Sequence, residues 1–267
     1  FFDELAKKST IGLAKTVPDG YAPGSDVANL SVMGYDPKEF YTGRSPLEAA
    51  SIGIPLADDD VTYRCNLVTL SEEAPYEAKR MIDYSSGEIT TREARELIGA
   101  LKQEFDKPPF TLYAGISYRH CLVARGEKTG SVLTPPHDIT DRPVAGSLPK
   151  GAMGETLLAM MKRSYEILND HPVNRARRAA GKNPANSAWF WGEGTKPLLR
   201  PFSDLYGKRG AVISAVDLVK GIGILAGMDV LEVAGATGNW DTNFAGKADA
   251  AADALLDGTD FVYVHME

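Results

Sequence analysis

A serine at the start of a short helical pattern is the first residue that could do chemistry. Ser25 follows Gly24 and precedes Asp26, and residues 27–33 have the spacing of a short helix that ends at Gly34. A helix N-terminus carries free N–H groups and about half a positive charge, which suits a phosphate or a developing alkoxide. An ordinary N-cap serine has the same local sequence. Both interpretations of Ser25, nucleophile and helix cap, therefore remain open at this point.

A basic segment is the second candidate. The run Asn174-Arg175-Ala176-Arg177-Arg178, extended to Lys182, contains no acidic residue, although the chain carries a net charge of −7. Guanidinium groups bind phosphate and carboxylate through paired hydrogen bonds. The nearby aromatic stretch from Trp189 to Gly192 would either wall an anion pocket or fill the core. A solvated helix face is the alternative interpretation of the basic segment.

Ionisable pairs at or just beyond predicted strand ends form the third group. Arg119 precedes His120, and His137 precedes Asp138. Histidine and aspartate can bind a metal ion, but no spacing in this sequence completes a metal site, and a lone histidine is more often structural. Lys220 lies early in a helix that follows a buried strand, where it would face either a cleft or solvent.

Two glycine-rich stretches resemble dinucleotide-binding loops only weakly. Gly221–Gly223 and Gly235–Gly238 lack the complete Gly-x-Gly-x-x-Gly pattern between a strand and a helix. The Gly-x-Ser-x-Gly elbow of α/β hydrolases does not occur either. The motifs therefore favour neither a dinucleotide enzyme nor a hydrolase of that class.

Hydrophobic periodicity predicts the elements that must position these residues. We expect helices over 46–50, 91–105, 151–170, 217–226 and 245–256, and strands over 61–70, 116–123, 211–216 and 261–265. Thr90 and Glu93 have the spacing of a capping box before the second of these helices. Strands 61–70 and 116–123 each carry a Tyr-Arg pair and could belong to one sheet. The stretch 181–201 is expected to be an ordered loop.

Composition excludes several classes of protein. Of 267 residues, 43% are hydrophobic and 24% charged, which is enough to bury a core and excludes a disordered chain. The excess of 36 acidic over 29 basic residues argues against broad binding to nucleic acid or a membrane surface. Two cysteines are too few for a disulfide scaffold, and the chain contains neither a transmembrane run nor a signal-peptide pattern. We expect a cytoplasmic enzyme.

The ends of the chain interrupt elements of structure. The sequence opens without Met inside a helical pattern, Phe1–Ala6, and stops in a strand pattern at Phe261–Glu267. Functional loops follow the carboxyl ends of such strands in α/β folds. We therefore expect residues to be missing at both ends.

A series of motifs spans nearly the whole chain in a fixed order. They are Val17–Leu30, Gly34–Pro37, Gly43–Ala49, Tyr63–Asn66, Tyr118–His120, Pro136–Asp138, His171–Asn174, Pro184–Asn186 with Trp189 and Trp191, Ala215–Leu218, Gly235–Gly238 and Asp241–Asn243. Taken in order, these motifs resemble those of the archaeal-type cofactor-independent phosphoglycerate mutases of the alkaline phosphatase superfamily.

The resemblance implies an α/β fold, in which part of an alkaline-phosphatase-like catalytic domain carries an inserted α+β domain. The catalytic domain would comprise residues 1–56 and 205–267, and the inserted substrate-binding domain residues 57–204. The family interconverts 3-phosphoglycerate and 2-phosphoglycerate in glycolysis and gluconeogenesis, through a phosphoserine at a site with two divalent metal ions (Mn, Zn, Co or Mg). The implied partner is a small phosphorylated substrate, with no nucleic acid or membrane, and the oligomeric state stays open.

The resemblance also assigns roles to residues. Ser25 would be the nucleophile and a metal ligand, Asp26 would support its loop, and Lys220 would contact the phosphoryl group. The inserted domain would bind phosphate and carboxylate through Arg119, His120, His137, Asp138, Asn174 and Arg177. The family's other metal ligands do not occur in this sequence, so we expect this chain alone to be inactive, with no metal or an incomplete site.

Two other functions stay open. The first is a metal-dependent phosphotransferase or phosphatase that acts on another small phosphorylated metabolite, a type sometimes labelled homoserine-kinase-like. The second is a non-catalytic fragment that binds anions weakly.

Overall fold

The first of two units in the chain is a short helical segment. The computed structural model describes residues 2–266, and the chain divides into two compact units, residues 1–41 and residues 42–267. The first unit contains α1 (Phe2–Ala6), α2 (Ser25–Val32) and α3 (Pro37–Phe40). Phe1 and Glu267, where the predicted terminal helix and strand patterns begin and end, lie outside the described residues.

The helix predicted after Ser25 is confirmed and begins slightly earlier than expected. Gly24 is the N-cap in an extended conformation, and Ser25 is the first helical residue. The turn after α2 contains Gly34 with φ +89°, a conformation that glycine adopts without steric cost. Asp36 then caps α3, because its side chain accepts a 2.9 Å hydrogen bond from the Lys38 N–H group.

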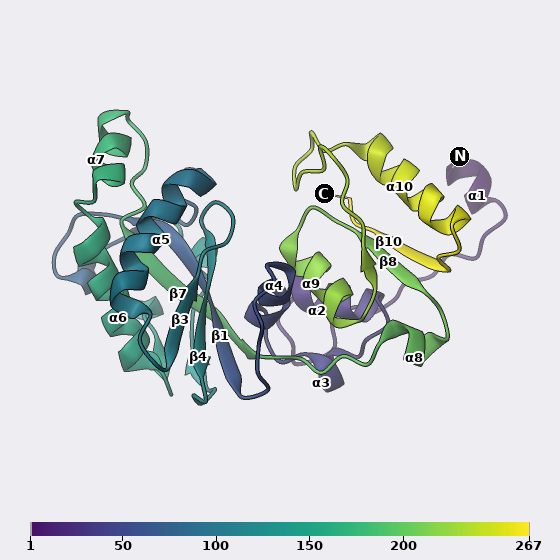
Figure 1. Cartoon of the computed structure of the whole chain (residues 1–267), viewed down its shortest axis with the longest axis horizontal. Coiled ribbons are helices and arrows are strands. Elements are labelled where there is room, and N and C mark those ends of the chain that lie inside the picture. Colours follow the sequence, from purple (N-terminus) through teal and green to yellow (C-terminus); the bar gives the residue numbers. More distant parts are fainter. Residues whose placement is uncertain (1, 267) are drawn as a thin grey trace. The chain divides into compact units, whose positions relative to one another are not determined.

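An antiparallel sheet forms the first part of the second unit (Figure 1). The central strand β1 (Asp60–Leu70) pairs with β4 (Arg119–Arg125) and with β7 (Ser187–Thr195), while β2 (Met81–Asp83) and β3 (Phe110–Tyr113) extend the sheet. The predicted pairing of the two Tyr-Arg strands is confirmed, although the second strand begins at Arg119 rather than residue 116.

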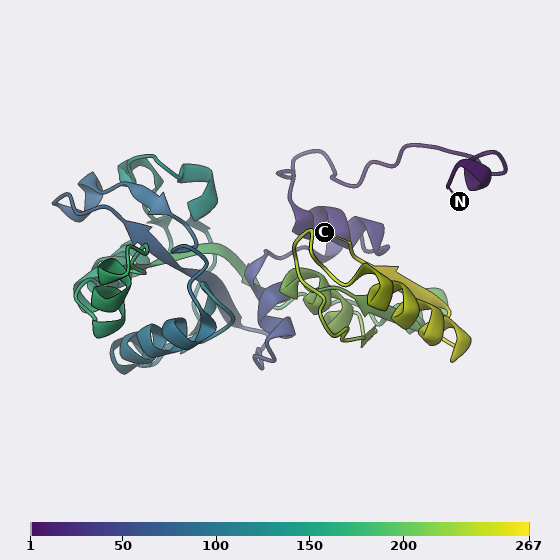
Figure 2. The ribbon, with the colours of Figure 1, turned by 90° about the horizontal axis from the view of Figure 1, so that it is seen from above.

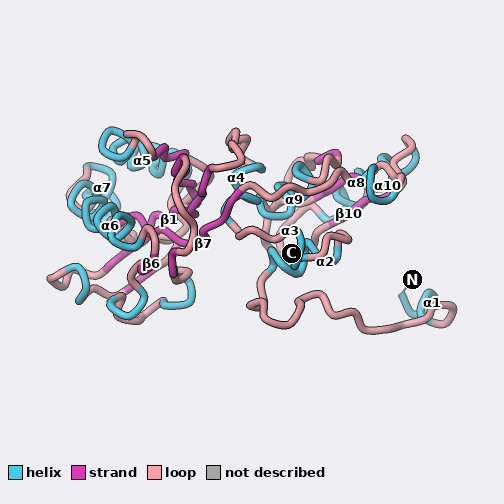
Figure 3. The backbone as a smooth tube through the Cα atoms, turned by 90° about the horizontal axis from the view of Figure 1, so that it is seen from below, coloured by secondary structure: helices cyan, strands magenta, loops and turns pink. Residues whose placement is uncertain are grey.

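The prediction of a loop over residues 181–201 is wrong in its centre. Residues 187–195 form β7, which runs beside β1 and is drawn as a strand in Figure 3. The glycines and prolines of this stretch suggested a loop. These glycines and prolines flank or interrupt a run of buried aromatic residues, and the backbone of that run forms its hydrogen bonds with β1. Tertiary pairing therefore outweighs the local turn signal.

Helices cover one face of the sheet (Figure 1). The helix α5 (Thr91–Phe105) packs along β3 and the helix α6 (Gly154–Leu168) along β7, and α7 (Pro172–Ala179) follows α6. The predicted capping box of α5 is confirmed, since the Thr90 side chain and the Glu93 side chain each accept the other residue's N–H group. Short strands β5 (Ser131–Val132) and β6 (Lys150–Gly151) form a separate pair.

The period-two alternation of β1 divides its side chains between the two faces of the sheet. Tyr63, Cys65 and Leu67 belong to the apolar core that α5 and α6 complete. Arg64 and Asn66 point to the opposite face, where the register pairs them with Cys121 and Arg119 of β4. The face of the sheet away from α5 and α6 therefore carries buried polar residues at its centre, and α4 (Ser45–Ser51) packs against part of it.

The last part of the second unit alternates strands and helices, as predicted. It contains α8 (Phe202–Tyr206), β8 (Gly210–Ile213), α9 (Asp217–Leu225), β9 (Asp229–Val230), α10 (Phe244–Leu256) and β10 (Phe261–Val264). The strands form a parallel sheet in the order β10-β8-β9, and Figure 2 shows α10 running along β10. The short strand β9 gave no sequence signal. The predicted mixed α/β fold class is confirmed.

The helix α4 (Ser45–Ser51) packs closely against α9. A Cβ atom added to Gly221 would lie 1.7 Å from the carbonyl oxygen of Leu47, so only glycine permits this approach. The contact joins residues on either side of the stretch 57–204, but the domain boundaries after residues 56 and 204 stay predictions. Within residues 2–266, every helix is too short or too polar to cross a bilayer.

Candidate functional site

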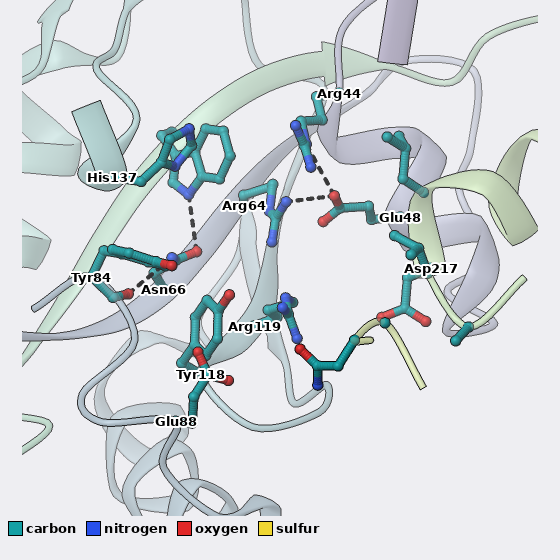
Figure 4. A pocket seen from close by; sticks show the side chains of 16 residues that line it. Arg44, Glu48, Arg64, Asn66, Tyr84, Glu88, Tyr118, Arg119, His137 and Asp217 are labelled. Atoms are coloured by element: carbon teal, nitrogen blue, oxygen red, sulfur yellow. Dashed lines mark hydrogen bonds and ion pairs between the residues drawn. The ribbon is translucent and has the colours of Figure 1, made fainter. Parts of the chain in front are cut away.

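A cavity of about 560 Å³ lies over the polar face of the antiparallel sheet (Figure 4). Its lining comes from β1, β4, β7 and α4, and from the N-terminus of α9 and the loop before α10. The cationic side chains of the lining are Arg44, Arg64 and Arg119. The carboxylates are Glu48, Glu88 and Asp217. The cavity therefore concentrates guanidinium groups in a chain that is acidic overall.

One carboxylate holds two of the guanidinium groups. The Glu48 Oε1 atom accepts hydrogen bonds from Arg64 Nη1 at 2.5 Å and from Arg44 Nε at 3.1 Å. Arg64 is 5% exposed, and its Nε atom is buried with no partner among residues 2–266. Burial lowers the pKa of Arg64, and the charge of Glu48 opposes that effect. Arg64 thus retains hydrogen-bonding capacity that the described chain leaves unused.

Trp191 supports the same two arginines. Its ring centroid lies 4.5 Å from the Arg64 Cζ atom and 5.5 Å from the Arg44 Cζ atom, within the range of cation–π contacts. The indole Nε1 donates a 3.0 Å hydrogen bond to Asn66 Oδ1, and Asn66 Nδ2 donates to the Tyr84 carbonyl oxygen. Ring and hydrogen bonds together fix the floor of the cavity.

Two of the predicted substrate-binding residues line this cavity. Arg119 lies over the Tyr118 ring, with its Cζ atom 4.4 Å from the centroid. The His137 ring stands edge-on to Trp191, with centroids 5.3 Å apart. Burial lowers the pKa of His137, and Asp138 partly offsets the shift from 3.6 Å away. Near neutral pH, His137 is therefore an uncharged donor and acceptor.

His120 is buried and faces a small recess rather than the main cavity. The recess is also lined by Arg64 and Arg119. The His120 Nδ1 atom accepts the Gly115 N–H group at 3.1 Å, while Nε2 is buried with no partner among the described residues. Burial, reinforced by the charge of Arg64, lowers the pKa of His120 to about 3. The imidazole is thus neutral in the folded chain.

Asn174 and Arg177 are engaged within the fold and do not line the cavity. Asn174 Nδ2 donates to the Leu168 and Ala185 carbonyl oxygens, and its Oδ1 accepts the Ala185 N–H group. All three nitrogen atoms of the Arg177 guanidinium donate hydrogen bonds. Nε donates to the Asn183 carbonyl oxygen at 2.8 Å, Nη1 to Glu93 Oε2 at 2.9 Å, and Nη2 to the Ser86 carbonyl oxygen at 2.6 Å. Both side chains tie α7 to its neighbours, so an anion-binding role for them stays a prediction.

Asp138 and Lys220 also lie outside the cavity lining. Asp138 is exposed beside His137. Lys220 Nζ donates to both carboxylate oxygens of Glu232, at 2.7 and 2.8 Å. The predicted contact of Lys220 with a phosphoryl group would require this ion pair to be exchanged.

Ser25 is exposed at the first position of α2. Asp26 supports the turn in front of it: its Oδ1 atom accepts the Val27 N–H group at 3.0 Å, and its Oδ2 atom accepts the Tyr41 hydroxyl at 2.5 Å. A Cβ atom on Gly24 would lie 2.4 Å from Asp26 Oδ1, so a larger residue there would require the Asp26 carboxylate to move. The serine is thus presented on a braced helix N-terminus.

The described residues do not fit the two-metal site that the resemblance implies. Between residues 2 and 266, no three His, Cys, Asp or Glu side chains come close enough together to hold a metal ion.

Sequence reasoning missed much of the cavity lining. Arg44, Glu48, Arg64 and Asp217 were not predicted as site residues, although each lines the cavity. Trp191, which also lines it, was considered only as the wall of a pocket beside the basic segment or as part of the core. One signal was available: Arg64 and Asn66 are two residues apart in an apolar strand, which places both on one face of the sheet. The convergence of α4 and α9 on that face had no comparable signal.

Comparison with known proteins gives a consistent family assignment. Residues 6–174 match the family model described as 2,3-bisphosphoglycerate-independent phosphoglycerate mutase. A protein of that name from Methanosarcina barkeri is 53% identical over 266 residues, which cover 99% of this chain and 65% of the relative. A probable mutase of the same name from Geobacter sulfurreducens is 52% identical, with 99% and 66% covered.

Solved structures agree with this result. A Pyrococcus horikoshii protein superimposes with a TM-score of 0.68 at 29% identity, over 94% of this chain and 58% of that protein. A cofactor-independent phosphoglycerate mutase from Thermoplasma acidophilum gives 0.55 at 26% identity, with 92% and 65% covered. The chain spans about two thirds of the length of the curated relatives it matches. It belongs to the 2,3-bisphosphoglycerate-independent phosphoglycerate mutase family.

Proposed function

We propose that this chain supplies the substrate-binding cavity and the phosphoryl-accepting serine of an enzyme that interconverts 3-phosphoglycerate and 2-phosphoglycerate. The enzyme would act in the cytoplasm, in glycolysis and gluconeogenesis. The observation that carries the proposal is the cluster of Arg44, Arg64 and Arg119 around one cavity, in a chain of this family. The substrate carries a phosphate and a carboxylate, and guanidinium groups bind both with paired, charge-assisted hydrogen bonds.

The arrangement of the arginines favours an anion with more than one charged group. Glu48 and Trp191 hold Arg44 and Arg64 together, while Arg119 approaches from β4. Because Arg64 is buried, its charge is weakly screened and its bonds to a bound oxyanion are stronger than they would be in water. Neutral His137 adds a donor without a further charge.

The proposed chemistry at Ser25 is a double displacement. The Ser25 oxygen attacks phosphorus and loses its proton; a Ser–O–P bond forms, the ester bond to glycerate breaks, and the departing oxygen takes a proton. The second hydroxyl of glycerate then attacks the phosphoserine: a new O–P bond to glycerate forms, the Ser25 O–P bond breaks, and the Ser25 oxygen accepts the proton that the attacking hydroxyl loses. The phosphoryl group is then on the other hydroxyl oxygen of glycerate. The N–H groups of the first turn of α2 favour the negative charge that develops there.

For the full-length protein the proposal includes the two divalent metal ions implied by the resemblance. When bound, such ions neutralise phosphate charge and activate a hydroxyl. Residues 2–266 do not supply their ligand set, so we expect this chain alone to bind substrate without turnover.

The test uses the full-length parent protein. It is supplied with 3-phosphoglycerate and manganese, without bisphosphoglycerate, and 2-phosphoglycerate is followed in a coupled assay beside the Ser25→Ala variant. Interconversion that is lost in the variant supports the proposal. Release of free phosphate without the isomer would replace it with the phosphatase alternative, and no reaction despite bound metal would show that the substrate is wrong.

A further inference from the structure

Asp217 is a carboxylate placed among the cationic groups of the cavity. It is the first residue of α9, and it lines both the main cavity and the small recess that Arg64, Arg119 and Glu48 also line. Figure 4 shows its carboxylate on the side of the cavity away from Tyr84. A carboxylate lowers the affinity of a cavity for anions, so its presence indicates an interaction that the arginines cannot make.

The position of Asp217 is fixed by its neighbours. The Ser51 hydroxyl, at the end of α4, donates a 3.1 Å hydrogen bond to Asp217 Oδ1. The close approach of α9 to α4 at Gly221 leaves little room for the two helices to slide. Asp217 Oδ2 has no partner among residues 2–266. One oxygen is thus held, while the other is available to a ligand.

The other two carboxylates of the lining are less suited to contact a ligand. Glu48 is occupied by the guanidinium groups of Arg44 and Arg64. Glu88 is an exposed residue, with its backbone in the left-handed region at φ 50°. Asp217 is therefore the carboxylate that is both held in place and available.

An ionised carboxylate only accepts hydrogen bonds, so it repels the phosphate and carboxylate of a ligand and can bind only a donor. In a phosphorylated hydroxy acid, the donor is the free hydroxyl. We propose that Asp217 is a specificity-determining residue that accepts a hydrogen bond from this hydroxyl and makes the cavity select phosphorylated hydroxy acids over analogues without it. This inference rests on the proposed function of the cavity.

The test compares two ligands that differ only in the hydroxyl. The dissociation constants of 3-phosphoglycerate and of its 2-deoxy analogue, 3-phosphooxypropionate, are measured by calorimetry on the 267-residue chain. A hydrogen bond to a charged group corresponds to a preference of about 10- to 100-fold for the hydroxylated ligand. We expect Asp217→Ala to reduce this preference to about threefold or less. Asp217→Asn, which keeps an acceptor oxygen, should retain part of it.

Controls separate this inference from the proposed function. Asp249→Asn makes the same carboxylate-to-amide change on an exposed position of α10 and should keep the full preference. If Asp217→Ala does not fold, Ser51→Ala takes its place and should weaken the preference, because it releases Asp217. Failure of the unmodified chain to bind either ligand would overturn the proposed cavity and this inference together. Binding of 3-phosphoglycerate with no preference, or with a preference that survives Asp217→Ala, would overturn this inference alone.

Discussion

Two buried arginines of this chain, Arg64 and Arg177, have similar surroundings but differ in how many of their hydrogen-bond donors have an acceptor. Both are at most 5% exposed, and each is paired with one glutamate. All three nitrogen atoms of the Arg177 guanidinium donate to acceptors in the chain. Arg64 donates to Glu48, stacks on Trp191 and keeps a buried Nε atom without a partner among residues 2–266.

Burial and charge therefore do not by themselves identify a residue that binds a ligand. Acceptors within the fold saturate Arg177, so it stabilises the packing of α7, whereas the fold leaves Arg64 partly unsatisfied at the wall of a cavity. Unsatisfied buried donors carry a free-energy cost that a ligand can offset. On this basis we expect Arg64, rather than Arg177, to contact a bound anion.

The largest expected effect comes from Arg177→Ala. It leaves Glu93 and two carbonyl oxygens without their donor, so we expect the free energy of unfolding to fall by about 3–5 kcal/mol. Urea denaturation measures this change. The matched control is Arg175→Ala, which removes an exposed ion pair with Asp170 and should cost about 1 kcal/mol or less. Equal effects of the two substitutions would contradict the structural role of Arg177.

Arg64→Gln should act mainly on ligand binding. The loss of charge-assisted hydrogen bonds predicts an affinity for 3-phosphoglycerate that is about 10- to 100-fold lower. Glu48 keeps Arg44 as a partner, so the free energy of unfolding should fall less than it does in Arg177→Ala. Calorimetry and urea denaturation give the two values, with Arg125→Gln at the exposed end of β4 as the control. An unchanged affinity would remove Arg64 from the proposed site.

The buried neutral state of His120, beside Arg64, predicts a pH dependence of stability. Its pKa is about 3 in the folded chain and 6.5 in the unfolded chain, so between these values only the unfolded chain binds the proton. Unfolding is therefore favoured as the pH falls below 6.5, by about 2 kcal/mol at pH 5.

The variant His120→Asn supplies a non-titrating acceptor for the Gly115 N–H group. The stability difference between the unmodified chain and the variant, from urea denaturation, should shift by about 2 kcal/mol in favour of the variant between pH 7 and pH 5. A difference that does not vary with pH would show that His120 is not held neutral next to Arg64.

The smallest expected effect concerns the other partner of Glu93. Thr90→Ala removes the side-chain cap of α5 and should cost about 1 kcal/mol in urea denaturation. Thr90→Ser keeps the hydroxyl and should cost much less. A cost for Thr90→Ala as large as that for Arg177→Ala would mean that the cap, rather than the buried ion pair, is the main role of Glu93.

Local chemistry accounts for the parts of the fold that the sequence predicted. The capping box of Thr90 and Glu93 predicted the start of α5, and Gly34 predicted the end of α2. The apolar stripe through Leu157 and Met161 predicted the extent of α6. The strand β7 was missed because its strand character depends on pairing with β1, which no local signal around Trp189–Gly192 conveys.

The candidate site was harder to predict for the same reason. Arg119 and His137 were selected from sequence and do line the cavity. Asn174 and Arg177 were selected on equal grounds, but their acceptors come from residues remote in the sequence, such as Ala185, Ser86 and Glu93. Arg44 and Asp217 belong to the lining only because α4 and α9 pack together, and no pattern within either helix indicates that contact.

The most direct test of the central claim is a calorimetric titration of this chain with 3-phosphoglycerate at low ionic strength, beside Arg64→Gln and Arg177→Lys. We expect saturable binding with one site per chain. Arg64→Gln should weaken this binding by about 10-fold or more, while Arg177→Lys should leave it within about threefold of the unmodified chain. Binding that is unaffected by Arg64→Gln, or that is lost only in Arg177→Lys with the chain still folded, would contradict the assignment of the cavity as the substrate site.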